Sequence, residues 1–348
     1  MLRERLSAQL LAGKPARDPL SVVERLLAVQ GQDARGARLA VRARSTGLTA
    51  GDVHRALTDD RSLLITWLNR GTLHLVRSED YPWLHALTTP QLLAGNTRRL
   101  RQEGVSEAAA ERGVAAIERA LADEGPLTRP QLRDRVAAAG VPTERQALVH
   151  MLFLASLRGL VVRGPMAGRE HAYALVADWL PKPPLFDRDR ALAELARRYL
   201  AGHGPADEAD LAKWAGIRLR GARAGLAAIA PVLEQRPDGL VDLLRRPAAA
   251  ELPPPRLLGP YEPVLLGWVS RAPLLGDNAD RVTVEGLFRS FALVRGRAAA
   301  TWTLAGGAVS IEPFGRLSRA VTAALEADAK DVVRFLGGEA AQARERAR

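Results

Sequence analysis

Two glutamines, Gln30 and Gln32, flank a glycine at an expected break between two helices. A carboxamide carries a hydrogen-bond donor and an acceptor together, but it is a poor base. Such a pair could orient a water molecule for a reaction that does not need the water to be strongly deprotonated. The pattern alone favours a second interpretation, in which both side chains bond loose backbone groups at a helix end.

Three arginines follow the glutamine pair at helical spacing. Arg35, Arg38 and Arg42 stand at i, i+3 and i+7, so they share one face of the helix expected over residues 34–44. Such a stripe could bind phosphates, and a solvated basic face is an equally good interpretation of the stripe taken alone. Because it begins three residues after Gln32, we expect a phosphate-binding face beside the candidate site.

A hairpin is expected next, with strands over residues 63–67 and 72–76 around an Asn-Arg-Gly turn. Side chains alternate along a strand, so Thr72 and His74 share one face, close to Arg70 in the turn. These three residues could contact a sugar or a phosphate. For His74, the pattern is equally compatible with a packing histidine that bonds a neighbouring carbonyl.

Other chemistry is poorly supported. The chain has no cysteine, and its six histidines form no metal-binding pair, so we expect neither a metal site nor a cofactor. Walker, Rossmann and Gly-x-Ser-x-Gly glycine patterns are absent. Adjacent carboxylates such as Asp59 and Asp60 are typical of helix boundaries rather than of a catalytic dyad.

The same arrangement, helices followed by a hairpin, is expected three times, which predicts tandem winged helices. Two Gly-Pro helix starts lie 79 residues apart, at Gly125 and Gly204, and a chance recurrence of such turns is the alternative. After a proline-rich linker at residues 252–255, alternating β-formers predict a small antiparallel sheet, closed by a helix from Leu317 to about Glu326. We expect four domains: winged helices over 1–105, 106–182 and 183–250, and a β-domain over 251–340.

The charge balance indicates a polyanionic partner. There are 50 Lys and Arg against 39 Asp and Glu, for a net charge of +11. A high-GC genome would explain the preference for arginine over lysine, but not the excess over acidic residues, so nucleic acid is the expected partner. The charged start and the absence of a long apolar run predict no signal peptide, no membrane span and a cytoplasmic protein.

Several segments together resemble one family, the AlkZ/AlkX (YcaQ)-like DNA glycosylases. The combination of Gln-x-Gln with Arg-Gly-Thr-Leu-His is fairly specific, and the match runs in order from about residue 5 to residue 336. Gln-x-Gln is similar to AlkZ-type members, whereas AlkX-type members carry Gln-x-Asp. Gly31 and Asn69 depart from the family pattern, which has a larger aliphatic residue and a methionine there, and both could alter the fit of a lesion. The matching segments are residues 27–35, 66–76, 81–83, 258–268 and 296–302.

The resemblance implies a mainly α protein with a small β content, in which tandem winged helices form an open C and a C-terminal antiparallel β-domain follows. It implies a monomeric, monofunctional DNA glycosylase that removes N7-alkylated purines from double-stranded DNA, including bulky adducts and interstrand crosslinks. Gln30 and Gln32 would be the catalytic residues. The DNA-binding residues would be Arg35, Arg38, Arg42, Arg70, Thr72 and His74.

The chemistry of the residues agrees with that activity. An N7-alkylated guanine is already cationic, so its departure needs no general acid, and it leaves an oxocarbenium-like sugar. A water held by the two glutamines completes the hydrolysis, and their carbonyl dipoles favour the sugar cation. No lysine lies at the motif, so a Schiff-base lyase step is not suggested.

Two other functions stay open, of which the first explains the charge and the repeats equally well. One is a transcriptional regulator that binds DNA through its winged helices without catalysis, and the other is an interaction scaffold that binds protein. The sequence does not distinguish general repair of alkylated DNA from self-resistance to one toxin.

Overall fold

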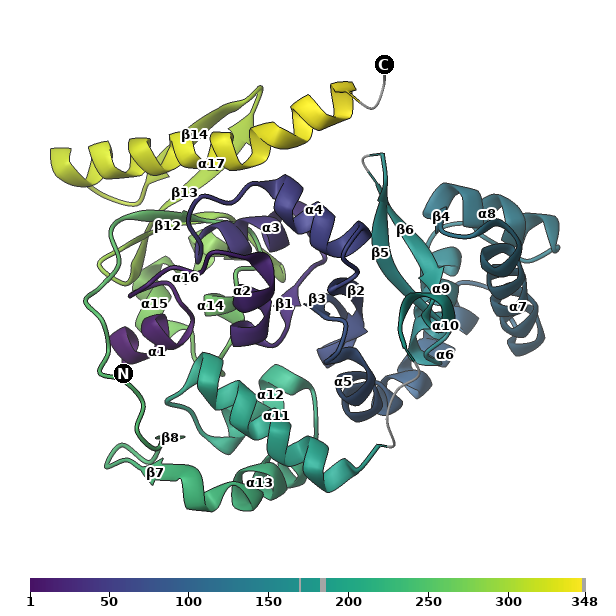
Figure 1. The fold of residues 1–348 in the computed structure, drawn as a ribbon, viewed down its shortest axis with the longest axis horizontal. Helices are drawn as coiled ribbons and strands as arrows, with labels where there is room; N and C mark the ends of the chain where they lie inside the picture. The colour runs from purple at the N-terminus through teal and green to yellow at the C-terminus, as the bar shows by residue number, and fades with distance from the viewer. Residues whose placement is uncertain (169, 182–185, 346–348) are drawn as a thin grey trace. The chain divides into compact units, whose positions relative to one another are not determined.

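The computed structural model describes residues 1–168, 170–181 and 186–345, and it divides into two compact units (Figure 1). The first unit joins Met1–Val53 to the chain from Arg188 onward, and the second is His54–Asp187. The division falls inside helix α4 (Ala50–Thr58), so the segment predicted as one domain over 1–105 is shared by both units. The predicted boundary at residues 182 and 183 lies outside the described residues.

In the N-terminal segment of the first unit, the helix before the glutamine motif ends earlier than the sequence predicts. After α1 (Leu2–Ala8), α2 (Pro19–Leu26) begins where Asp18 Oδ1 accepts a hydrogen bond of 2.7 Å from Ser21 N. Leu27 follows with φ 63°, a left-handed value that ends the helix. Apolar residues at helical spacing predict a helix over residues 20–29, but the observed helix stops three residues sooner, and the short strand β1 (Val29–Gln30) leads into the glutamine motif.

Helix α3 (Ala34–Arg42) begins as predicted. Asp33 Oδ1 accepts a hydrogen bond of 2.6 Å from Gly36 N, which satisfies one of the free donors of the first turn. The helix ends at Arg42, two residues before the predicted end. Asp33, the residue after Gln32, therefore lies at the start of this helix.

The third predicted repeat contains the expected elements. Three helices are followed by a two-stranded antiparallel hairpin that pairs Leu233 with Leu243. Its elements are α11 (Arg188–His203), α12 (Glu208–Ala215), α13 (Leu219–Ala228), η3 (Ala230–Val232), β7 (Leu233–Gln235) and β8 (Val241–Leu243).

A four-stranded antiparallel sheet follows, in the order β14-β13-β12-β9. Helix α17 (Arg319–Glu345) runs along it (Figure 1), and Leu325 and Val332 of this helix share a core with Leu257 and Trp302 of the sheet. The helix is far longer than predicted, because its alanine-rich stretch after residue 326 continues the helix. The other elements are β9 (Arg256–Leu258), α14 (Pro263–Leu266), α15 (Ala272–Leu275), η4 (Gly276–Asn278), α16 (Ala279–Val282), β10 (Thr283–Val284), β11 (Leu287–Phe288), β12 (Phe291–Val294), β13 (Arg297–Ala305) and β14 (Ala308–Pro313).

The second unit is built on an antiparallel sheet whose strands lie in the order β3-β2-β5-β6-β4. The first predicted hairpin is confirmed, with Leu68 paired to Thr72 across the turn. The helices of the second repeat are confirmed in kind, with shifted ends. The elements are β2 (Leu63–Leu68), η1 (Asn69–Gly71), β3 (Thr72–Arg77), α5 (Tyr81–Thr88), η2 (Pro90–Leu92), α6 (Leu93–Gln102), α7 (Glu107–Glu124), β4 (Leu127–Thr128), α8 (Arg129–Ala138), α9 (Ala147–Leu157), β5 (Val161–Ala167), β6 (Glu170–Leu175) and α10 (Val176–Trp179).

Both units are thus mainly helical with antiparallel sheets, as the sequence predicted. Within the part of the chain that the structure describes, no helix combines the length and the apolar character needed to cross a bilayer.

Candidate active site

The two glutamines lie side by side. Gln30 ends strand β1 and is 7% exposed, while Gln32 is exposed just before the cap of α3. Gln30 Nε2 donates a hydrogen bond of 2.7 Å to Gln32 Oε1. This bond brings both carboxamides to one place, as the hypothesis of a shared water molecule requires, and it ties an exposed amide to a buried one.

The predicted arginine stripe is not an exposed face. Arg35 is exposed, but Arg38 is buried and Arg42 is 4% exposed. Arg42 forms ion pairs with Asp328 and Asp331 of α17, the second at 2.8 Å. Its guanidinium is therefore used inside the protein, so the three arginines do not form one exposed stripe; helical spacing alone does not show what the shared face packs against.

The ion pair between α3 and α17 is electrostatically favourable. Burial opposes the charged form of Asp331, yet hydrogen bonds from Arg42 and Arg334 lower the pKa of this carboxyl below its usual value. Arg42 Nη1 also donates to the backbone oxygen of Leu257 at 3.1 Å. The arginine thus joins α3 to both the sheet and the last helix of the first unit.

A second buried arginine fixes the chain just after α3. Arg44 and Glu262 are fully buried and form an ion pair. Arg44 Nε donates to the backbone oxygen of Gln9 at 2.8 Å, and its Nη2 donates to Gln9 Oε1 at 2.9 Å. The residue types gave no signal for this pair, because its members are 218 positions apart in the sequence.

The first turn of α3 also packs closely against the loop after β9. A Cβ atom added at Gly36 would lie 2.5 Å from the backbone oxygen of Pro260, and one at Gly259 would lie 3.0 Å from Leu39 Cβ. Both glycines permit this close approach. The helix that follows the glutamine motif is therefore held by packing at its start and by ion pairs at its end.

The remaining predicted site residues belong to the second unit. Arg70 lies in the hairpin turn with φ 58°, and both it and Thr72 are half-buried. His74 is 2% exposed, and its Nδ1 donates to the backbone oxygen of Thr72 at 2.9 Å. Burial, with a smaller effect of the nearby Arg70 charge, lowers the pKa of His74 to about 3.

His74 is therefore a neutral packing histidine at physiological pH. This matches the alternative that the sequence left open, a packing histidine that bonds a neighbouring carbonyl. Thr72 and His74 do share one face of β3, but in the structure this face is covered at His74. The structure thus groups Gln30, Gln32 and Arg35 in the first unit, and Arg70 and Thr72 in the second.

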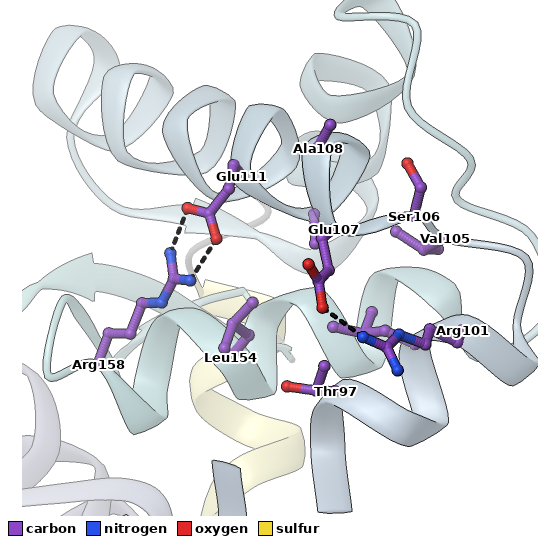
Figure 2. Close-up of a pocket in the computed structure, with 11 residues that line it drawn as sticks. Thr97, Arg101, Val105, Ser106, Glu107, Ala108, Glu111, Leu154 and Arg158 are labelled. Atoms are coloured by element: carbon purple, nitrogen blue, oxygen red, sulfur yellow. Dashed lines mark hydrogen bonds and ion pairs between the residues drawn. The ribbon is translucent and has the colours of Figure 1, made fainter. Parts of the chain in front are cut away.

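A cavity of about 370 Å³ lies among α6, α7 and α9 of the second unit. Figure 2 shows its charged side chains joined in pairs, Arg158 with Glu111 and Arg101 with Glu107. The hydrogen bond from Arg158 lowers the pKa of Glu111. Each charge on the lining thus has a counter-charge, and none of the predicted site residues lies on the cavity.

The described residues contain no group of three or more His, Asp or Glu side chains that could hold a metal ion. The polar groups at the glutamine motif are amides, which neither titrate nor ligate metals strongly. The arrangement can orient a small polar molecule and can stabilise positive charge through carbonyl oxygens.

Comparisons with known proteins agree with one another. The family model for AlkZ-like DNA glycosylases matches residues 23–335. A protein of Streptomyces sahachiroi described as an interstrand DNA cross-link repair glycosylase is 27% identical over 372 residues, which cover 96% of this chain and 95% of that protein. The solved structure of the Streptomyces sahachiroi DNA glycosylase AlkZ has a similar fold, with a TM-score of 0.73 and 24% identity over 97% of this chain and 95% of that one.

Proposed function

Because this chain belongs to the AlkZ-like DNA glycosylase family, we propose that it hydrolyses the N-glycosidic bond of N7-alkylated purines in duplex DNA, including bulky adducts and interstrand crosslinks. The observation that supports this proposal is the hydrogen bond between Gln30 and Gln32. It joins two carboxamides at the start of a firmly held helix. Its biological setting would be DNA repair or self-resistance to a DNA-alkylating toxin.

The proposed reaction suits amides. Alkylation at N7 makes the purine cationic, so the base leaves without a proton from the enzyme and the sugar becomes oxocarbenium-like. A water held by the amides of Gln30 and Gln32 attacks the opposite face of the sugar. Their carbonyl oxygens carry the negative ends of dipoles, which stabilise the positive charge on the sugar. The attacking water gives its proton to solvent after attack, so no strong base is needed.

The proposed DNA contacts are Arg35 beside the glutamines and Arg70 and Thr72 on the hairpin turn, because these side chains are exposed or half-buried. Arg38, Arg42 and His74 are buried and already interact with other groups of the protein, so we do not assign them phosphate contacts. The tandem winged helices, their C-shaped arrangement and the monomeric state stay predictions for this protein.

The test is base release from a duplex with one N7-methylguanine and from a second duplex with a bulky N7-alkylguanine. The reactions are run at saturating protein, and the abasic sites that they produce are then detected by alkaline cleavage of the DNA. We expect Gln30→Ala and Gln32→Ala each to lower the rate by about 100-fold, the loss typical of a group that stabilises transition-state charge. Because the two amides act together, the double variant should lose little more than either single one.

Gln102→Ala provides the matched control, since Gln102 is an exposed glutamine of α6 in the other unit. Its rate should equal that of the wild type. Binding to the undamaged duplex should also be unchanged in the Gln30 and Gln32 variants. Release that persists in the double variant would overturn the proposed site, and the lack of release from either lesion by the wild type would overturn the proposed substrates.

A further inference from the structure

The turn of the β2–β3 hairpin combines two unfavourable features at neighbouring residues. Asn69 is 0% exposed, and neither its Nδ2 nor its Oδ1 has a hydrogen-bond partner among the residues that the structure describes. Arg70 has φ 58°, a left-handed conformation that is costly for a residue with a side chain. Such costs gather at functional sites, where stability is given up for a contact with a ligand.

The amide of Asn69 does not hold the turn together. The turn is tied through the backbone oxygen of Asn69, which accepts from the backbone N–H of Thr72 and, at 3.2 Å, from Thr72 Oγ1. It also packs against an aromatic ring, since a Cβ atom added at Gly71 would lie 3.4 Å from Phe153 Cζ. The ring of Phe153 in turn lies 5.5 Å from that of Trp67. An apolar side chain at position 69 would therefore serve the turn equally well.

Asn96 shows how a buried asparagine is satisfied in the same unit. It lies in α6 and is 2% exposed. Its Nδ2 donates to the backbone oxygen of His150 at 3.0 Å, and its Oδ1 accepts from His150 Nδ1 at 2.8 Å. The two asparagines are thus alike in burial and opposite in bonding, and only Asn69 lies beside the proposed DNA contacts Arg70 and Thr72.

We propose, building on the proposed function, that the carboxamide of Asn69 binds a hydrogen-bonding edge of the alkylated guanine in the substrate DNA. A carboxamide is satisfied by a partner that both accepts and donates a hydrogen bond. Phosphate oxygens only accept, whereas the minor-groove edge of guanine, which alkylation at N7 leaves unchanged, offers the N3 acceptor and the N2 amino donor side by side. Because Asn69 is buried in the free protein, the three-residue turn Asn69–Gly71 must rearrange when DNA binds.

The first test measures thermal stability without DNA. Asn69→Leu removes an unpaired buried amide, so we expect its Tm to rise by about 2 to 4 °C. Asn96→Leu removes a bonded amide and leaves His150 without its partner, so its Tm should fall. Asn69→Ala, which cannot overpack the site, should not fall below the wild type by more than about 1 °C. A Tm well below that of the wild type in both Asn69 variants would show that the amide is already bonded in the folded protein, and would overturn the proposal.

The second test measures DNA binding rather than turnover. The probes are a duplex with one 2′-fluoro-N7-methyldeoxyguanosine, which resists cleavage, and the same duplex with a tetrahydrofuran abasic analogue at that position. We expect the wild type to prefer the base-containing duplex and Asn69→Leu to lose about tenfold of that preference, the discrimination of one good base contact. Both proteins should bind the abasic duplex equally.

The two proposals can fail separately. Binding and Tm do not depend on base release, so these tests are informative even if the chain releases neither alkylated base. A preference that is absent in the wild type, or that Asn69→Leu retains in full, would overturn the nucleobase contact while leaving the role of Gln30 and Gln32 untouched.

Discussion

At the scale of single residues, burial together with a partner inside the protein separates His74 and Arg42 from the groups proposed to act on DNA. His74 is neutral because burial, together with Arg70, lowers its pKa to about 3, far below the 6.5 of an exposed histidine. Between pH 6.5 and pH 3 the unfolded chain binds a proton at this residue that the folded chain does not. The free energy of unfolding therefore falls as the pH falls through this range, by up to about 1.4 kcal/mol per pH unit.

We therefore expect His74→Asn to make the protein less sensitive to acid. Asparagine can still donate to the backbone oxygen of Thr72, but it does not titrate. Urea denaturation at pH 7, 6 and 5 measures the difference, with the wild type as reference. The buried His203, whose pKa burial also lowers to about 3, is present in both proteins and cancels. Parallel pH profiles for the two proteins would show that His74 is not the titrating group.

The residue types predicted that the two amides lie together, but they could not predict what the arginines pack against. The Gln-x-Gln spacing indicated that both amides act at one place, and in the structure they bond each other. The spacing of the arginines showed that they share a helix face, but Arg42 meets a carboxylate 289 positions away. Only the tertiary fold brings such partners together, so a local pattern cannot distinguish a phosphate-binding arginine from a buried ion pair.

At the scale of elements, helix α3 depends on close packing at its first turn. A methyl group at Gly36 would lie 2.5 Å from the backbone oxygen of Pro260, which cannot move as a side chain can. We expect Gly36→Ala to lower the free energy of unfolding by about 1 to 3 kcal/mol, as overpacking does. Because the start of α3 follows Gln32 directly, base release should fall in this variant more than DNA binding does.

Gly95→Ala is the matched control for this prediction. Gly95 lies inside α6, and apart from its chain neighbours and the nearby backbone of this helix, no described atom would come within 4 Å of its added methyl group. Alanine is the better helix former, so this change should raise the free energy of unfolding by about 0.5 to 1 kcal/mol. Urea denaturation of both variants shows whether each change raises or lowers the free energy of unfolding. A stabilising effect at Gly36 would show that the loop at Pro260 yields and does not hold the helix.

The elements that the sequence predicted well are those with strong local signals. Asp33 capped the predicted helix, and the Asn-Arg-Gly turn made the predicted hairpin. The end of α2 was missed because Leu27, rather than a glycine, takes the left-handed conformation. The length of α17 was missed because the sequence after residue 326 is rich in polar residues, whereas in the structure Leu325, Val332 and Phe335 bury the inner face of the helix.

At the scale of the whole molecule, the net charge of +11 favours binding to DNA of any sequence. Some of the cations are neutralised internally, as the ion pairs of Arg42 and Arg44 show. Exposed arginines such as Arg35 supply the charge that phosphates meet. A repair enzyme needs this kind of binding, since lesions arise in any sequence, whereas a regulator needs discrimination between undamaged sequences.

We therefore expect two undamaged duplexes of unrelated sequence to bind with Kd values within about twofold of each other, and both to weaken steeply with salt. Each phosphate that the protein neutralises contributes about 0.9 to the slope of log K against log salt. The wild type should show a slope steeper than about −3, and Arg35→Gln should reduce its magnitude by about one. Fluorescence anisotropy between 50 and 300 mM KCl measures both quantities. A strong preference for one undamaged sequence would instead support the regulator, and a slope near zero would support the protein-binding scaffold.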